Sequence, residues 1–349
     1  MSVCQSKPVV CALLIAGLSL SSVALAQGVH NNQHLRFTQE HGITFSTIGD
    51  AGNPAYTYFN INQTASVGRV DYEYRIATTE TTVAQYARFV DVYRHFVPQN
   101  EAINLAGNSL GWLGNDAAGS PAYAIPSGWE SRPAYASFRY FARMANWLHH
   151  GAPDLANASH DTFAVGAYDD TVTGTRTPGA RVWIPSRDEW VKAAHWDPNR
   201  NGPGEGGYWL FPDASDEQLM PGDPAMGGET SAGNAVEWPS EQFRPWDVGS
   251  YGDVQTPWGL LDASGGAREW TEDRGSPFNT SRLVLSTGRS PTELTPGDQL
   301  YRDRIELFHV DSALASGRYV TARFAMAVPS PGVLGIGGIA VVVLFRRSR

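Results

Sequence analysis

Both cysteines of the chain, Cys4 and Cys11, lie close to its N-terminus. They belong to a segment whose apolar run, residues 9–25, ends in the pattern Ala-Leu-Ala that a signal peptidase accepts. We therefore expect residues 1–26 to be a signal peptide, with export and cleavage before Gln27; an uncleaved membrane anchor is the alternative. The mature body then has no thiol and must fold without disulfides, although an oxidising compartment would permit them.

The absence of thiols from the body limits its chemistry as well as its fold. It excludes a cysteine nucleophile, copper or zinc held by cysteine, and an iron–sulfur cluster. The chain is 42% hydrophobic and contains 36 Gly, 22 Pro, 11 Trp, 14 Tyr and 14 Phe. This composition is too aromatic for a disordered chain and indicates a loop-rich globular protein.

The charge balance of the body argues against a nucleic-acid partner. The full chain has 26 basic and 35 acidic residues, and its only lysines are Lys7 and Lys192. Loss of both ends would remove Lys7, Arg346, Arg347 and Arg349 but no acid, which leaves 22 basic against 35 acidic residues and a charge near −13. A body this acidic offers no basic face for phosphates.

The C-terminal residues 328–349 have three parts. Val-Pro-Ser-Pro-Gly at 328–332 precedes an apolar stretch at 333–345, and the chain ends in Arg-Arg-Ser-Arg. This order resembles the PEP-CTERM sorting signals of Gram-negative bacteria. The resemblance implies transient anchorage in the inner membrane, removal of the tail by a sortase-like protease, and a periplasmic, outer-surface or extracellular body. A plain single-pass anchor is the alternative, and it gives the same outward topology.

Hydrophobic periodicity predicts short strands and a few helices in the body. Alternation predicts strands at 43–48 and 71–76. Capping patterns predict helices that begin after Thr82, Ser137 and Ser186. A strand is expected at 181–184, an exposed excursion with a hairpin at 152–180, and mostly loops after residue 197. The sequence therefore predicts one α+β domain over 71–326, to which the strand region 27–70 belongs.

Four blocks of the chain, in order, resemble the sulfatase-modifying-factor family, whose members include formylglycine-generating enzymes. The blocks are RIATTETTVAQYARFV at 75–90, the segment from Arg132-Pro133 to Asn146-Trp147-Leu148, RVWIPSRDEWVKAA at 181–194 and WGLLDASGGAREW at 258–270. They are spread over about 200 residues. The resemblance implies a C-type-lectin-like α+β fold, the formylglycine-generating-enzyme fold, with few short helices and strands.

The fourth block predicts a cation site. Asp262 and Glu269 place two carboxylates around a Gly265-Gly266 turn, and oxygen ligands on a bent loop suit Ca²⁺. The family resemblance implies that the ligands are the side chains of Asp262 and Glu269 and the carbonyls of Gly265 and Ala267. The alternative is that Glu269 forms a surface ion pair with a neighbouring arginine, Arg268 or Arg274.

Another stretch of the chain matches the family's second calcium site, but less well. Its pattern is an asparagine and the next carbonyl, then an acid and a carbonyl two residues later. Here those positions are Asn234, Ala235, Glu241 and Phe243. A turn-capping Asn234 and a solvated Glu241 are the alternative.

The oxidase chemistry of the family is not expected in this chain. Formylglycine-generating enzymes use a pair of cysteines that bind copper, and the corresponding stretches, 285–290 and 318–324, contain no cysteine. We therefore expect no copper. His149, His150 and His195 fall at predicted helix ends, where a cationic imidazole would complement the helix dipole. A metal cluster of His30, His34 and His41 is the remaining alternative.

The sequence thus favours an exported, surface-sorted, calcium-stabilised binding or envelope protein. Rings on loops can stack on sugars or clamp a peptide, so a glycan or a peptide is the expected ligand. The tryptophans expected in loops are Trp112, Trp129, Trp196, Trp209, Trp238, Trp246 and Trp258. Alternatives are an enzyme of the same family with non-cysteine chemistry, an oxidoreductase or a hydrolase, and a purely structural matrix component.

Overall fold

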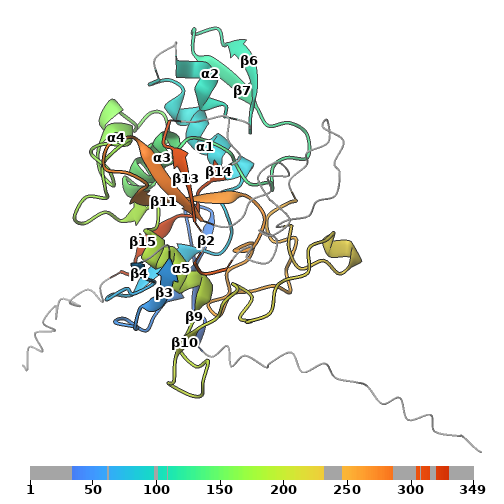
Figure 1. Ribbon diagram of the computed structural model, residues 1–349. Coiled ribbons are helices and arrows are strands. Elements are labelled where there is room, and N and C mark those ends of the chain that lie inside the picture. The colour runs from blue at the N-terminus through green and yellow to red at the C-terminus, as the bar shows by residue number, and fades with distance from the viewer. Residues whose placement is uncertain are drawn as a thin grey trace, which may run out of the picture. The chain divides into compact units, whose positions relative to one another are not determined.

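A five-stranded sheet brings together segments from both halves of the sequence (Figure 1). In spatial order its strands are β1 (Phe37–Glu40), β2 (Ile43–Ile48), β5 (Tyr74–Ala77), β15 (Ala325–Ala327) and β8 (Val182–Trp183). All neighbouring strands are antiparallel. Ile43, Phe45 and Ile48 of β2 are buried and Thr44 is exposed, which confirms the strand predicted at 43–48.

This computed structural model describes residues 34–60, 63–97, 101–107, 109–231, 246–285, 304–306, 308–314 and 320–329. All of these belong to one unit, Asn32–Arg349. The predicted signal peptide lies outside the described residues, as does nearly all of the predicted sorting tail. Within the described part, no helix is long and apolar enough to cross a membrane.

The three predicted helices are present. In α1 (Val83–Tyr93) and α5 (Arg187–His195), the side chains of Thr82 and Ser186 each accept a hydrogen bond from the backbone of the third helical residue, which completes a capping box. α3 (Phe138–His149) follows Ser137 and buries most of its side chains. Two short helices, α2 (Ala102–Leu105) and α4 (His160–Ala164), and the 3₁₀ turn η3 (Pro224–Met226) were not predicted.

A second sheet occupies the part of the sequence where mostly loops were expected. Its order is β13 (His309–Ser312), β12 (Ser281–Leu285), β11 (Arg268–Arg274) and β14 (Val320–Thr321). β11 runs parallel to β14, and the other neighbours are antiparallel. Three two-stranded sheets complete the strands: β3 (Tyr56–Asn60) with β4 (Gln63–Val67), β6 (Gly111–Asn115) with β7 (Pro121–Ala124), and β9 (Trp196–Asp197) with β10 (Gly207–Tyr208).

The segment 152–180 lies largely at the surface, as its composition predicts, but it is anchored to the core in part. It contains α4, and the side chains of Phe163 and Tyr168 are buried. The Asn146 side chain of α3 donates to the carbonyls of both of these residues and accepts from the Tyr168 amide. Arg282 adds bonds to the carbonyls of Val172 and Gly174. Buried polar groups therefore hold a segment that has few apolar residues.

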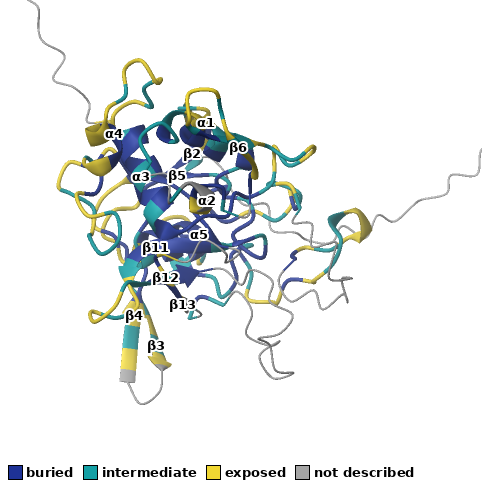
Figure 2. Cartoon of the chain, turned by 90° about the horizontal axis from the view of Figure 1, so that it is seen from above, coloured by how far each residue is buried: buried dark blue, intermediate teal, exposed yellow. Residues whose placement is uncertain are grey.

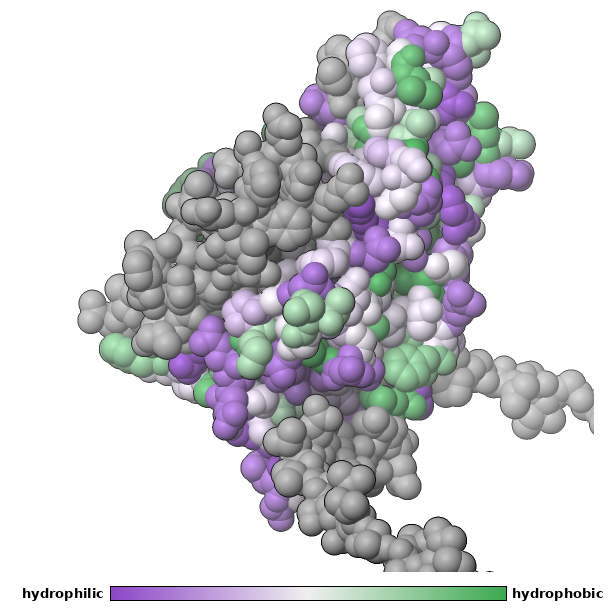
Figure 3. Space-filling view, turned by 90° about the vertical axis from the view of Figure 1, so that its right-hand side faces the viewer, coloured by the Kyte–Doolittle hydropathy of each residue, from purple (hydrophilic) through white to green (hydrophobic). Residues whose placement is uncertain are grey.

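The described residues form a mixed α+β structure, rich in loops and with few short helices, as the sequence predicts. Buried residues gather around α3, α5 and the two larger sheets, and the exposed ones lie mainly in the outer loops (Figure 2). On the face shown in Figure 3, hydrophobic residues form small patches between hydrophilic ones.

Candidate functional site

A tight turn at residues 262–267 leads directly into β11 and carries the first predicted calcium site. The backbone of Asp262, Gly265 and Gly266 has positive φ, at 56°, 75° and 60°. Glycine is required at 266 for a second reason: a Cβ atom there would lie 2.4 Å from Oε1 of Glu80. The turn therefore places its backbone against a carboxylate that the sequence analysis did not select.

Hydrogen bonds from other segments hold this turn in place. The amide of Gly266 donates to Oγ of Ser231 at 2.8 Å, and the amide of Ala267 donates to Oε1 of Glu80, also at 2.8 Å. The Asp262 carboxylate accepts from the amide of Gly249. Three separate segments thus fix the positions of the backbone and of Asp262.

Glu269 is buried and ion-paired with Arg323. Nη2 of Arg323 lies 2.8 Å from Oε1 of Glu269, and neither side chain has exposed surface. The indole Nε1 of Trp190 donates to Oε2 at 2.7 Å. The predicted alternative, a surface ion pair of Glu269 with Arg268 or Arg274, is wrong, because Glu269 has no exposed surface and pairs inside the protein with Arg323 from a distant segment.

Glu80 is the residue at this site that sequence reasoning missed. Its side chain is 1% exposed; Oε1 accepts from Ala267, and Oε2 has no hydrogen-bond partner among the described residues. Burial, followed by the charges of Asp262 and Glu269, raises the pKa of Glu80 well above its usual range. Its place in the first family block, before a helix cap, gave no signal that it would meet residue 267.

Among the described residues, the site therefore brings together three buried acidic side chains and the buried cation Arg323. Burial raises the pKa of Asp262 to about 6, and the charge of Glu269 also contributes. In the described part of the chain, no three acidic or histidine side chains come close enough to hold a metal on their own. A cation here would need backbone carbonyls and water, which suits Ca²⁺ because it takes six to eight oxygen ligands.

The second predicted calcium site, made of Asn234, Ala235, Glu241 and Phe243, lies outside the described residues. Of the predicted histidine cluster, His30 also lies outside them. His34 contacts the carbonyl of Pro257 at 2.8 Å. Burial lowers the pKa of His149 and lowers that of His195 to about 4, which disfavours the cationic form on which their predicted role at the helix ends depends.

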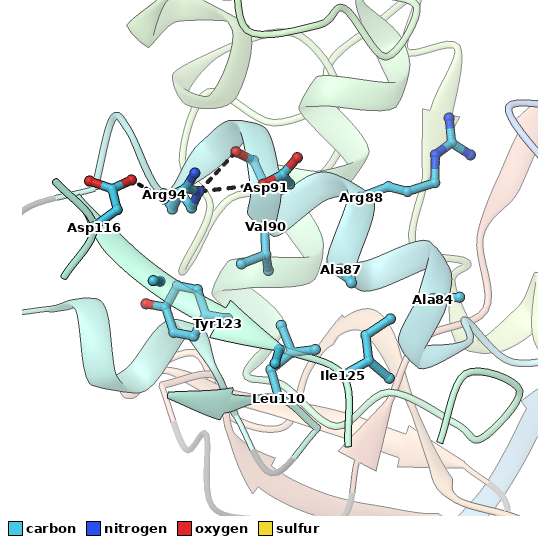
Figure 4. Close-up of a pocket in the computed structure, with 12 residues that line it drawn as sticks. Ala84, Ala87, Arg88, Val90, Asp91, Arg94, Leu110, Asp116, Tyr123 and Ile125 are labelled. Atoms are coloured by element: carbon cyan, nitrogen blue, oxygen red, sulfur yellow. Dashed lines mark hydrogen bonds and ion pairs between the residues drawn. The ribbon is translucent and has the colours of Figure 1, made fainter. Parts of the chain in front are cut away.

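A pocket lies between α1 and the β6–β7 hairpin (Figure 4). It has a volume of about 400 Å³, and its walls include Val90 of α1 together with Leu110 and Ile125. An ion pair between Arg94 and Asp116, 2.6 Å long, lies at one end. The small side chains of Ala84 and Ala87 leave room along the helix, and the lining combines aliphatic residues with the charged side chains of Arg88 and Asp91.

Most of the predicted loop tryptophans are not displayed. Trp196 and Trp258 are buried, while Trp129 and Trp209 are half-buried with an arginine over each ring. Trp246 is half-buried, and Trp238 lies outside the described residues. Trp112 is different: it is 52% exposed and lies opposite Tyr123 of the pocket wall in the β6–β7 pairing.

The comparisons with known proteins assign no family. No family model matches the chain, and no curated protein matches it. Among solved structures it is similar to Treponema denticola variable protein 1 (TM-score 0.49, 14% identity, 84% of this chain and 99% of that one). It is also similar to CarF (0.46, 14%, 82% and 98%) and to PvdO from Pseudomonas aeruginosa (0.45, 12%, 84% and 98%). At these identities and TM-scores the likeness assigns no activity.

Proposed function

We propose that this chain is an exported protein of the sulfatase-modifying-factor type, with a C-type-lectin-like fold, that binds Ca²⁺ for stability and binds a ligand without oxidising cysteine. The four sequence blocks support the family and the fold. The single observation that carries the calcium proposal is the set of buried acids at Glu80, Asp262 and Glu269, for which the described part of the chain supplies the buried counter-charge of Arg323.

A cation fits this site for an electrostatic reason. An ionised carboxylate in a protein interior costs several kcal/mol unless it is paired. The Glu269 carboxylate has Arg323, whereas Oε2 of Glu80 is buried without a partner among the described residues. A divalent cation would supply the missing positive charge. The Asp262 carboxylate and the carbonyls of Gly265 and Ala267 would hold it, and the family resemblance adds Glu269.

The role of the cation would be structural. The 262–267 turn leads into β11, and its Asp262 carboxylate accepts a hydrogen bond from the amide of Gly249. At its other end, the amide of Ala267 donates to Glu80, which lies just before α1. Calcium at the turn would join these segments, so its binding free energy would add to folding stability. No step of any reaction is assigned to it.

The pocket beside α1 supports the binding role, and its chemistry favours a peptide. An aliphatic floor formed by Val90, Leu110 and Ile125 suits an apolar side chain, and Trp112 can cover it from the hairpin.

The planar polar groups that could hold a sugar are already engaged: Arg94 is ion-paired with Asp91 and Asp116. Arg88 donates to the carbonyl of His41, so we favour an apolar peptide over a sugar. Binding to glycans on an array, without binding to apolar peptides, would reverse this assignment.

Export and surface sorting rest on the two ends of the sequence. Mass spectrometry of the protein recovered from the producing cell tests both export and sorting. The proposal requires cleavage before Gln27 and removal or membrane retention of residues 328–349. A full-length chain in the cytoplasm would contradict it.

The calcium proposal is tested on the purified protein by metal analysis and thermal unfolding. Calcium bound in stoichiometric amount, with a Tm that falls on chelation and returns on adding Ca²⁺ but not on adding Mg²⁺, is the expected result. A stoichiometric redox metal together with turnover would instead favour the enzyme alternative. A Tm that does not respond to chelation would remove the calcium claim.

A further inference from the structure

We propose that Glu80, and not Glu269, is the second acidic side chain of the cation site. This inference rests on the proposed calcium function and deepens it, because it changes which residues hold the ion. The acidic pair would be Asp262, in the turn itself, and Glu80, which reaches the turn from the segment before α1.

The first argument is that Arg323 has no donor to spare. Its five N–H groups are all used: Nη1 bonds the carbonyls of Ala77 and Thr78, Nη2 bonds the carbonyl of Leu261 and Oε1 of Glu269, and Nε bonds Glu269. If Glu269 turned toward a cation, two guanidinium donors would be left buried without partners. A buried charge that loses its partner is strongly destabilising, so the pair stays closed.

The second argument concerns the carboxylate of Glu269 itself. Oε2 accepts from Trp190 at 2.7 Å and from Nε of Arg323 at 3.0 Å, and Oε1 accepts from Nη2 at 2.8 Å. Most of its lone pairs are therefore occupied, and its charge is already balanced. Glu269 is best described as a positioning residue, which holds the start of β11 against Arg323.

Glu80 has the opposite properties. Oε1 accepts from the amide of Ala267, so the carboxylate lies against the same turn whose carbonyls are the expected ligands. Oε2 is buried and without a partner among the described residues. The absence of a side chain at Gly266 leaves room for this approach, since a Cβ would lie 2.4 Å from Oε1 and 3.4 Å from Oε2. A buried carboxylate oxygen of this kind is available to a cation or to a water molecule bound to it.

The backbone around Glu80 is held firmly enough to position a ligand. The amide and the hydroxyl of the next residue, Thr81, both donate to the carbonyl of Ala322, at 2.9 and 2.7 Å. Thr82 then caps α1. Glu269 and Arg323 neutralise each other. The ionised carboxylates of Glu80 and Asp262 would then add a charge of −2, which one divalent cation balances.

The test is a calcium titration of the purified protein by calorimetry, with thermal unfolding in chelator as a second readout. The variants are Glu80→Gln and Glu269→Gln, and the matched control is Glu130→Gln, an exposed glutamate in which the same substitution is made. We expect Glu80→Gln to weaken calcium binding at least tenfold, because it removes a carboxylate ligand. Its Tm in chelator should stay equal to or rise above that of the parent, because glutamine keeps an acceptor for the Ala267 amide and Oε2 has no partner to lose.

Glu269→Gln should behave differently, lowering the Tm both with calcium and in chelator because it leaves Arg323 without its counter-charge. Glu80→Asp, which keeps the charge but shortens its reach by one methylene, should also weaken binding. Parent-like affinity in both Glu80 variants would overturn the inference while leaving calcium binding intact. A parent protein that binds no calcium is a different result, and it would reject the proposed calcium function together with this inference.

Discussion

Arg323 and Glu269 lie 54 positions apart in the sequence and form a fully buried ion pair with an Nη2–Oε1 distance of 2.8 Å. Arg323 precedes β15 of the five-stranded sheet, and Glu269 belongs to β11 of the four-stranded sheet. The pair therefore connects the two larger sheets of the protein. Because the same arginine bonds the carbonyls of Thr78 and Leu261, it also fixes the start of the 262–267 turn.

The first prediction is that Arg323→Met destabilises the protein by about 3 to 5 kcal/mol, because it leaves the carboxylate of Glu269 buried without its cation. Urea unfolding in the presence of chelator measures this loss without a contribution from calcium. Glu269→Gln should lower the free energy of unfolding much less when it is made in the Arg323→Met variant than when it is made in the parent. Additive losses would show that the two side chains do not act as a pair.

A second prediction concerns the close approach at Gly266. Gly266→Ala introduces a Cβ 2.4 Å from the Glu80 carboxylate in a backbone with φ of 60°, so we expect a loss of about 2 to 4 kcal/mol. Gly179→Ala is the matched control, because φ there is 82° and nothing lies within 4 Å of the added atom. It should cost about 1 kcal/mol, the backbone strain alone. Equal losses in the two variants, measured by thermal unfolding, would exclude a clash with Glu80.

The elements with a local sequence signal were predictable. The capping boxes at Thr82 and Ser186 are formed by residues three positions apart, so the helix starts could be identified without knowledge of the fold. The β11 strand, REWTEDR, has no apolar alternation because several of its buried positions carry charged or polar side chains. Their burial is possible only with partners from distant segments, and a periodicity argument cannot find such a strand.

The candidate site shows the same limit. The sequence identified the turn around Gly265 and its two acids, and both acids are buried there. The sequence did not identify Glu80, whose contact with Ala267 spans 187 positions. It also did not identify the ion pair in which Arg323 balances the charge of Glu269. Which carboxylate is available to a cation depends on the donors around it, and those donors are set by tertiary structure.

A third prediction follows from His195. The ring is buried, and its Nδ1 lies 3.2 Å from the carbonyl of Trp209, which can only accept, so the neutral ring donates from Nδ1. Burial lowers the folded-state pKa to about 4, whereas the unfolded chain has a pKa near 6.5. Between these values the unfolded state binds more protons, so the free energy of unfolding falls as the pH falls from about 6.5 to about 4, by up to about 3 kcal/mol.

Urea unfolding at several pH values checks this dependence. In His195→Gln the part of the slope due to this residue should be absent, so the difference in stability between parent and variant should shrink steadily below pH 6.5. His160→Gln, at an exposed histidine, serves as the control for removing a ring. If the free energies of unfolding of the parent and of His195→Gln change with pH by the same amount across this range, protonation of His195 is not coupled to unfolding.

The last prediction concerns the pocket beside α1. Ala87→Leu places three more carbon atoms over the aliphatic floor from a half-buried helical position, so it should reduce binding of apolar peptides at least tenfold. Leucine is a good helix former, and the substitution should therefore change stability by less than about 1 kcal/mol. Trp112→Ala should weaken the same binding by removing the exposed ring opposite Tyr123, whereas Leu155→Ala, at an exposed apolar position that does not line the pocket, should have no effect. Fluorescence anisotropy with labelled apolar peptides distinguishes these outcomes, because a peptide that binds equally well to the parent and to Ala87→Leu must occupy some other surface.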